Sequence, residues 1–181
     1  NFAKAFTEIN INVSKWKTQD MVAKRQIEDG DNTHEGWVMI NDLVSKGYKY
    51  QAACQLATLK PDRLTARQVA NGDESEFFVN IEYGKRIHKA LKDRFGEGDD
   101  KTIKTKEFTK EIVLSIQKLT NRKGVEWATD IMEKFINTLP GKDVTDIKTA
   151  KSTKVQRKDE KRKQILDKAF SFFLGQNNIK L

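Results

Sequence analysis

The sequence has few of the residues that usually build catalytic and metal sites. It contains one cysteine, Cys54, so an internal disulfide is excluded, and its two histidines, His34 and His88, lie in different segments. A zinc site made of cysteine and histidine ligands is therefore excluded as well. Cys54 lies in an alanine-rich stretch, which is typical of a small buried thiol rather than of a nucleophile.

The scarcity of cysteine also bears on the cellular compartment of the protein. A lone cysteine fits a reducing compartment, so we expect an intracellular protein, cytoplasmic or, in a eukaryote, nuclear. No run approaches the roughly 18 apolar residues of a membrane-spanning helix. We therefore expect no membrane span. The cations near the C-terminus precede the apolar residues instead of sharing a segment with them, so we also expect no membrane partner.

The sequence also lacks the glycine-rich motifs that hold phosphates and the G-x-S-x-G motif of hydrolases. We accordingly predict that the protein is not an enzyme, with no catalytic residue, no bound metal and no cofactor. One pattern nevertheless resembles the acid–acid–lysine metal site of restriction-type nucleases, namely Asp62 followed by Glu82 and Lys85. That family places one residue between the second acid and the lysine, whereas this chain has two, and Asp62 also suits a helix N-cap. A metal-dependent nuclease is kept as a second alternative function.

Charge is abundant and unevenly distributed. The 181 residues carry a net charge of +8. Residues 1–100 contain 15 Lys and Arg against 16 Asp and Glu, a net charge of −1, whereas residues 101–181 contain 19 against 10, a net charge of +9. A localised excess of this kind indicates a polyanionic partner. Ten phenylalanines and three tryptophans indicate a folded chain rather than a disordered one.

The first half predicts an α+β domain over residues 1–96. Residues 35–40 and 75–83 have the β-branched and aromatic composition of strands, and the segments around them have helical patterns. The order strand, helix, helix, helix, strand suggests a winged helix-turn-helix module, in which residues 49–60 or 62–71 would be the recognition helix. Its exposed side chains would be Lys49, Gln51, Gln55, Arg63 and Arg67, because Arg reads guanine and Gln reads adenine.

The second half, residues 97–181, predicts a three-helix bundle. Glycines and acidic residues at 96–100 are typical of a linker, so we place the domain boundary there. Apolar residues recur every three or four positions at Phe108, Ile112, Ile116 and Leu119, and again from Trp127 to Leu139. The third helix is predicted to be long, from about 145 to 174. The expected fold is therefore α+β but predominantly α-helical.

The run at 148–168 carries nine Lys or Arg and three acidic residues, without Pro or Gly. Cations one or two helical turns apart lie about 5 to 11 Å from one another, which suits contacts to several phosphates. We therefore expect a nucleic-acid-binding protein, with DNA favoured over RNA, whose phosphate contacts come from Lys151, Lys154, Arg157, Lys158, Lys161, Arg162 and Lys163. The alternative for this run is a solvated helix face with ordinary surface ion pairs.

The run ends in an apolar segment that supports an alternative function. Phe170, Phe172, Phe173 and Leu174 present apolar side chains in more directions than a single buried helix face requires. A helical scaffold that docks a protein partner, or a second copy of the chain as a homo-oligomer, through these residues is the first alternative.

Overall fold

The structure is a computed structural model that describes residues 17–96 and 101–181. These residues are predominantly helical, as predicted, and none of them lies in a strand. The helices are α2 (Thr18–Asp29), α3 (Glu35–Ser45), α4 (Tyr50–Thr58), α5 (Ala66–Asn71), α6 (Glu74–Phe77), α7 (Ile81–Phe95), α8 (Lys106–Lys123), α9 (Val125–Thr138), α10 (Gly141–Thr149) and α11 (Lys158–Gln176), with a 3₁₀ turn, η1 (Gly30–Asn32), after α2.

Both predicted strands are wrong, and the α+β assignment is wrong with them. Residues 35–40 form the start of α3, and residues 75–83 span α6 and the beginning of α7. Without a strand in the described ranges, the winged-helix outline has no wing. The aromatic and β-branched residues of both segments are used in helix packing instead of a sheet.

Local capping and ring packing explain the helical start of α3. The Nδ1 atom of His34 accepts a hydrogen bond from the Gly36 N–H at 3.0 Å and so caps the helix. The His34 ring stacks on Phe78 at 5.1 Å, and Trp37 meets the same ring edge-on at 4.8 Å. Tertiary contacts between aromatic rings thus override the strand preference of the composition.

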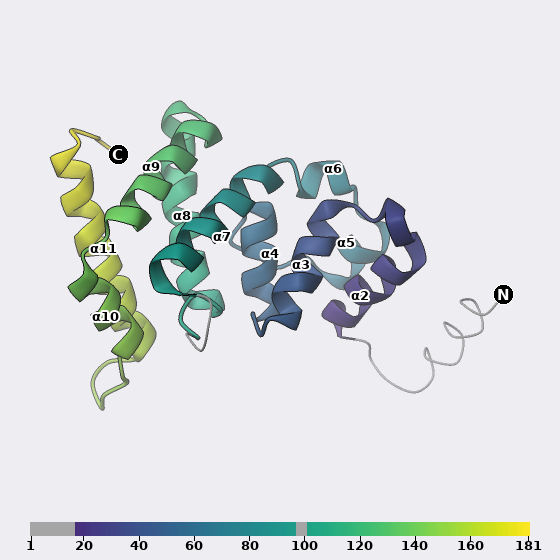
Figure 1. Cartoon of the computed structure of the whole chain (residues 1–181), viewed down its shortest axis with the longest axis horizontal. Helices are drawn as coiled ribbons and strands as arrows, with labels where there is room; N and C mark the ends of the chain where they lie inside the picture. Colours follow the sequence, from purple (N-terminus) through teal and green to yellow (C-terminus); the bar gives the residue numbers. More distant parts are fainter. Residues whose placement is uncertain (1–16, 97–100) are drawn as a thin grey trace.

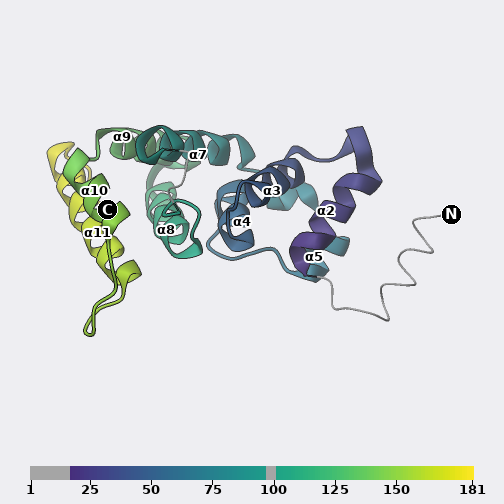
Figure 2. The same cartoon turned by 60° about the horizontal axis from the view of Figure 1, so that its bottom comes forward.

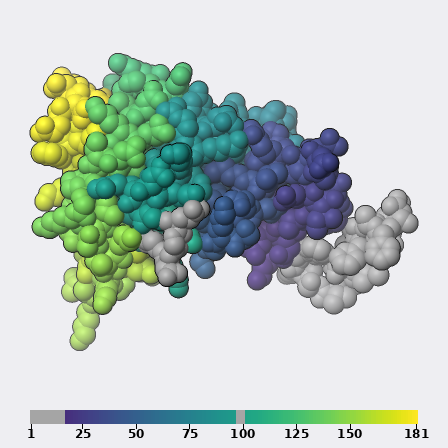
Figure 3. All heavy atoms as spheres, viewed as in Figure 1, coloured from purple at the N-terminus to yellow at the C-terminus, as the bar shows by residue number. Residues whose placement is uncertain are grey.

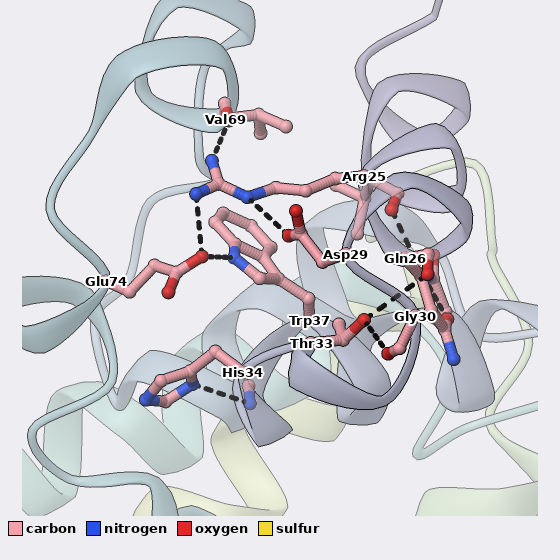
Figure 4. Close-up of polar contacts among 12 residues, drawn as sticks. Arg25, Gln26, Asp29, Gly30, Thr33, His34, Trp37, Val69 and Glu74 are labelled. Carbon is pink, nitrogen blue, oxygen red and sulfur yellow. Dashed lines mark hydrogen bonds and ion pairs between the residues drawn. The ribbon is translucent and has the colours of Figure 1, made fainter. Parts of the chain in front are cut away.

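A polar cluster around Arg25 connects four helices of the first half of the chain (Figure 4). The guanidinium of Arg25 donates to the Val69 carbonyl at 2.6 Å, pairs with Glu74 at 2.7 Å and lies over the Trp37 ring at 5.2 Å. The indole N–H of Trp37 donates to the same Glu74 carboxylate at 2.5 Å. Since these residues come from α2, α3, α5 and α6, the cluster stabilises the packing of all four.

Helix α4 lies at the centre of the fold. Figures 1 and 2 show α2 and α5 at one end, α10 and α11 at the other, and α4, α7, α8 and α9 between them. Every residue of α4 from Ala52 to Thr58 is buried, and α4 packs against α3, α7 and α8. The small side chains of Ala52, Ala53 and Ala57 allow these neighbours to approach closely. Cys54 is fully buried, as its setting predicted, and burial raises the pKa of its thiol to about 11.

The predicted periodicity of the second half is confirmed for α8. Phe108, Ile112, Ile116 and Leu119 are all buried. The third helix of the predicted bundle, however, is interrupted: α10 ends at Thr149 and α11 begins at Lys158. The prediction of one continuous helix from about 145 to 174 is therefore wrong, and the second half has four helices in its described residues instead of three.

The two predicted halves contact each other directly. Helix α4 packs against α8 and α7 packs against α9. The Thr109 hydroxyl donates a buried hydrogen bond to the Gln55 side chain, and Arg86 of α7 pairs with Asp130 and Glu133 of α9. The boundary near residue 97 stays a prediction, and residues 97–100 of the expected linker lie outside the described part of the chain. Among the described helices, none has the length and apolar character needed to cross a bilayer.

The close approach of α7 to α4 gives a first prediction. A Cβ atom at Gly84 would overlap the backbone carbonyl oxygen of Leu56. We expect Gly84→Ala to force the two helices apart and to lower the free energy of unfolding by about 2 kcal/mol. The matched control is Gly175→Ala in α11, where a Cβ meets open space and the helix gains about 0.5 kcal/mol. Thermal unfolding of both variants checks this, and equal midpoints would refute it.

Candidate nucleic-acid interface

The predicted cations of the second half lie on two different elements. Lys151, Lys154 and Arg157 belong to the α10–α11 loop, residues 150–157, and are exposed. Lys158, Lys161, Arg162 and Lys163 belong to the first turns of α11. The cationic run is therefore a loop followed by a helix N-terminus rather than one helical face.

Hydroxyl side chains explain why the helix is interrupted. The Thr153 N–H donates to the Gln156 carbonyl at 2.8 Å, and the Gln156 N–H donates to the Thr153 hydroxyl at 3.1 Å. These bonds close a turn whose tip is Lys154–Val155. The Ser152 hydroxyl accepts from the Lys158 N–H at 3.2 Å, at the start of α11. Serine and threonine here satisfy backbone groups that a continuous helix would have satisfied internally.

Arg162 is placed differently from the other predicted cations. Its side chain is 9% exposed, and its guanidinium donates to the Ile147 carbonyl at 3.0 Å and to the Thr102 hydroxyl at 3.1 Å. It also pairs with Asp159 at 3.3 Å. Arg162 thereby connects α10, the segment before α8, and α11, and its donors are directed into the protein.

Lys163 also has acidic partners. Its ammonium lies 2.5 Å from a Glu111 carboxylate oxygen and 3.1 Å from one of Asp167. The hydrogen bond to Glu111 is the main reason that the pKa of Lys163 is raised. By contrast, no acidic side chain of the described residues pairs with Lys151, Lys154, Lys158 or Lys161. These four lysines, of which Lys161 is half-buried, are available to an external anion, as is Lys168 at the other end of the run.

The predicted recognition helices of the first half do not offer a reading face. Gln55 is fully buried and donates to the Pro61 carbonyl at 2.7 Å, and Gln51 is half-buried beside the same carbonyl. Because α4 is buried along most of its length, it cannot enter a DNA groove. Arg63 and Arg67 are exposed, but they lie before and within the six-residue helix α5, at the far end of the molecule from α11 (Figure 1).

Lys49 is the one predicted residue of the first half that lies toward the cationic run. Its side chain is exposed, and its backbone N–H donates to the backbone carbonyl of Lys104 at 3.0 Å. The segment containing Lys104 also provides Thr102, which binds Arg162. Figure 1 shows the α3–α4 turn, the start of α8 and the α10–α11 loop along the same lower edge of the molecule. We call the cations of this margin the cationic edge: Lys49, Lys101, Lys104, Lys151, Lys154, Arg157, Lys158 and Lys161.

Lys101 and Lys104 were missed as candidates from the sequence. A signal was present, because residues 101–110 contain four lysines and one glutamate. The spacing of apolar residues in this stretch indicates only that an amphipathic helix begins there. The contacts to Lys49 and Arg162 are what bring it to the same edge as the basic run.

The apolar segment of α11 is mostly inside the protein. Phe170, Phe173 and Leu174 are buried, and Phe170 and Phe173 pack against the Phe135 ring of α9 at 4.9 and 5.5 Å. Phe172 is 69% exposed and lines a groove of about 480 Å³ between α9, α10 and α11. Of the four predicted docking residues, Phe172 alone is left largely free.

The nuclease pattern is not assembled. Lys85 pairs with Glu82 at 2.8 Å and with Glu35 at 2.7 Å, while Asp62 lies in the loop after α4. The described residues contain no group of three or more His, Cys, Asp or Glu side chains that could hold a metal ion. The hydrogen bond from Lys85 lowers the pKa of Glu35, which keeps this carboxylate charged in its ion pair.

Comparison of the chain with models of protein families, with curated proteins and with solved structures finds no match.

The position of Arg162 predicts a stability effect rather than a binding effect. We expect Arg162→Ala to lower the free energy of unfolding by about 2 to 3 kcal/mol, because two buried acceptors lose a charged donor. Arg157→Ala, which removes an exposed arginine five positions earlier, should change it by less than about 0.5 kcal/mol. Chemical denaturation of both variants makes the comparison. A stable Arg162→Ala variant would show that the connection between α10, α11 and Thr102 does not depend on this side chain.

Proposed function

We propose that the protein binds nucleic acid through phosphate contacts from the cationic edge. The observation that carries the proposal is the group of exposed lysines at the α10–α11 loop that lack acidic partners within the described residues. Like charges gathered on one margin repel one another, and a polyanion relieves that repulsion while releasing its own counterions. The net charge of +9 over residues 101–181 supports the same partner.

The geometry favours contact with a backbone over reading of bases. Lysine is a flexible point charge with no fixed fork of donors, so it suits phosphates more than specific base edges. The helices predicted to read bases are buried or lie at the opposite end of the molecule. We therefore expect binding that depends strongly on salt and weakly on sequence.

The test neutralises part of the cationic edge. We expect Lys151, Lys154 and Lys158→Gln together to weaken binding to duplex DNA on every sequence. If all three contact phosphates, the slope of log K against log salt falls by about 2.7, since each contact contributes about 0.9. Fluorescence anisotropy with labelled duplex and single strand over a salt series measures both quantities.

A matched control removes the same charge elsewhere. Lys118, Arg122 and Lys123 are exposed cations at the other end of α8, and their replacement by Gln should leave the salt slope close to that of the wild type. Equal losses in the two triple variants would mean that net charge alone attracts the DNA. Absence of binding by the wild type at low salt would reject the proposed function.

A second candidate function rests on the exposed ring of Phe172. The groove beside it has apolar walls and carries both Lys142 and Lys168 and Asp143 and Asp146. A two-fold-related copy can therefore match charges of opposite sign while each Phe172 enters the groove of the other copy. The occupant that we propose for this groove is a second copy of the chain.

Self-association has its own test. If Phe172 is central to a dimer, Phe172→Ala should raise the dimer dissociation constant at least about 30-fold, as expected for an interface hot spot of about 2 kcal/mol or more. Light scattering across a concentration series measures this, with Ile27→Ala as control for another exposed apolar side chain, 83% exposed on α2. A wild-type chain that stays monomeric at the highest concentration would remove this candidate.

A further inference from the structure

The tip of the α10–α11 loop carries the most exposed large apolar side chain of the described residues. Val155 is 96% exposed, beside Lys154 and two residues before Arg157. Figure 2 shows the loop extending well beyond the ends of α10 and α11, and Figure 3 shows it as a projection from the surface. An apolar side chain held in water at the end of a projection does not contribute to the core. Its position makes it available to an external surface.

The turn holds this side chain at its end by its own hydrogen bonds. Both the N–H and the hydroxyl of Thr153 donate to the Gln156 carbonyl, at 2.8 and 3.3 Å, so only Lys154 and Val155 lie between the closing residues. A two-residue tip is much narrower than a helix, whose diameter with side chains is about 10 to 12 Å. The minor groove of B-form DNA is about 6 Å wide and rejects a helix, whereas it can admit a single side chain at a tip.

Cations on both sides of the tip match the two rims of that groove. Lys151 and Lys154 precede Val155, and Arg157 and Lys158 follow it. A tip in the minor groove brings one set toward the phosphates of one strand and the other set toward those of the opposite strand. Proteins that bind this groove combine cations with apolar side chains placed against base steps in the same way.

We propose that the loop tip inserts Val155 into the minor groove of duplex DNA while the lysines beside it contact the phosphates of both rims. This inference rests on the proposed nucleic-acid function and adds the form of nucleic acid, the groove and the side chain that enters it. A membrane surface is the weaker partner, because one apolar side chain among cations does not give stable anchoring. A-form RNA is also disfavoured, since its minor groove is wide and shallow.

The groove can be identified by changing single groups on the DNA. Replacing guanine by inosine removes the 2-amino group from the minor groove and leaves the major groove unchanged. Replacing thymine by uracil removes the methyl group from the major groove only. An apolar side chain cannot accept a hydrogen bond from the guanine amino group, so its approach leaves that donor unpaired.

We expect the wild-type chain to bind the inosine duplex about tenfold more tightly than the parent duplex, because inosine removes the cost of leaving one donor unpaired, about 1.4 kcal/mol for a tenfold change. The uracil duplex should bind like the parent. Val155→Ser should lose the preference for inosine and keep the salt slope, while Val79→Ser, at a valine 68% exposed outside the loop, should keep both. Anisotropy titrations with the full chain give these affinities, and thermal unfolding confirms that both variants are folded.

The outcomes separate this inference from the proposed function. Equal binding of the inosine and parent duplexes by the wild type would overturn minor-groove insertion and leave phosphate binding standing. An effect of uracil without an effect of inosine would overturn it too, and would place the tip in the major groove. If the wild type bound phosphatidylserine vesicles and Val155→Ser did not, while both bound duplex DNA equally, the tip would be assigned to a membrane surface and minor-groove insertion would be overturned. Failure of the wild type to bind any duplex at low salt would overturn both proposals together.

Discussion

The close contact between α4 and α7 is the constraint on which the rest of the structure depends. Gly84 lies against the Leu56 carbonyl, and the alanines of α4 leave room for α3 and α8 on its other sides. A larger side chain at these positions would separate backbones that now touch. Since α7 also packs against α9, the placement of the second half depends on this contact.

Arg162 has a similar role at the other end of the molecule. Its donors bind groups from α10 and from the segment before α8, while its own backbone belongs to α11. This arrangement sets where the chain leaves α10 and where it enters α11. The cationic loop between the two helices is held at the edge of the protein by an arginine that itself faces inward.

The sequence predicted α8 well, but it predicted residues 35–40 and 75–83 wrongly as strands and missed the break between α10 and α11, for physical reasons. In α8 the apolar residues repeat every three or four positions and so lie on one face of the helix. This pattern identifies the helix directly. In α3 and around α6 the helical spacing of apolar residues was masked by β-favouring residues. Trp37 and Phe78 are needed there in an aromatic cluster whose partners lie far apart in the chain. Composition could not reveal those partners.

The candidate site shows the same limit. The excess of positive charge and its location near the C-terminus could be predicted. Which of these cations face solvent and which face the protein interior could not. Lys158 and Arg162 differ by one helical turn, yet one meets solvent and the other meets the Ile147 carbonyl. The interruption of the helix was missed because Ser152 and Thr153 do not forbid a helix, and they end it only through bonds to specific neighbours.

The turn closed by Thr153 and Gln156 has a consequence for the thermodynamics of any encounter. A charged loop without internal bonds would lose conformational entropy when it becomes ordered on a partner. Here the backbone of the tip is already fixed by bonds within the protein, so most of that ordering takes place during folding. Association at this loop should accordingly have a small entropic penalty from the backbone, and its remaining entropy change should come mainly from released ions and water.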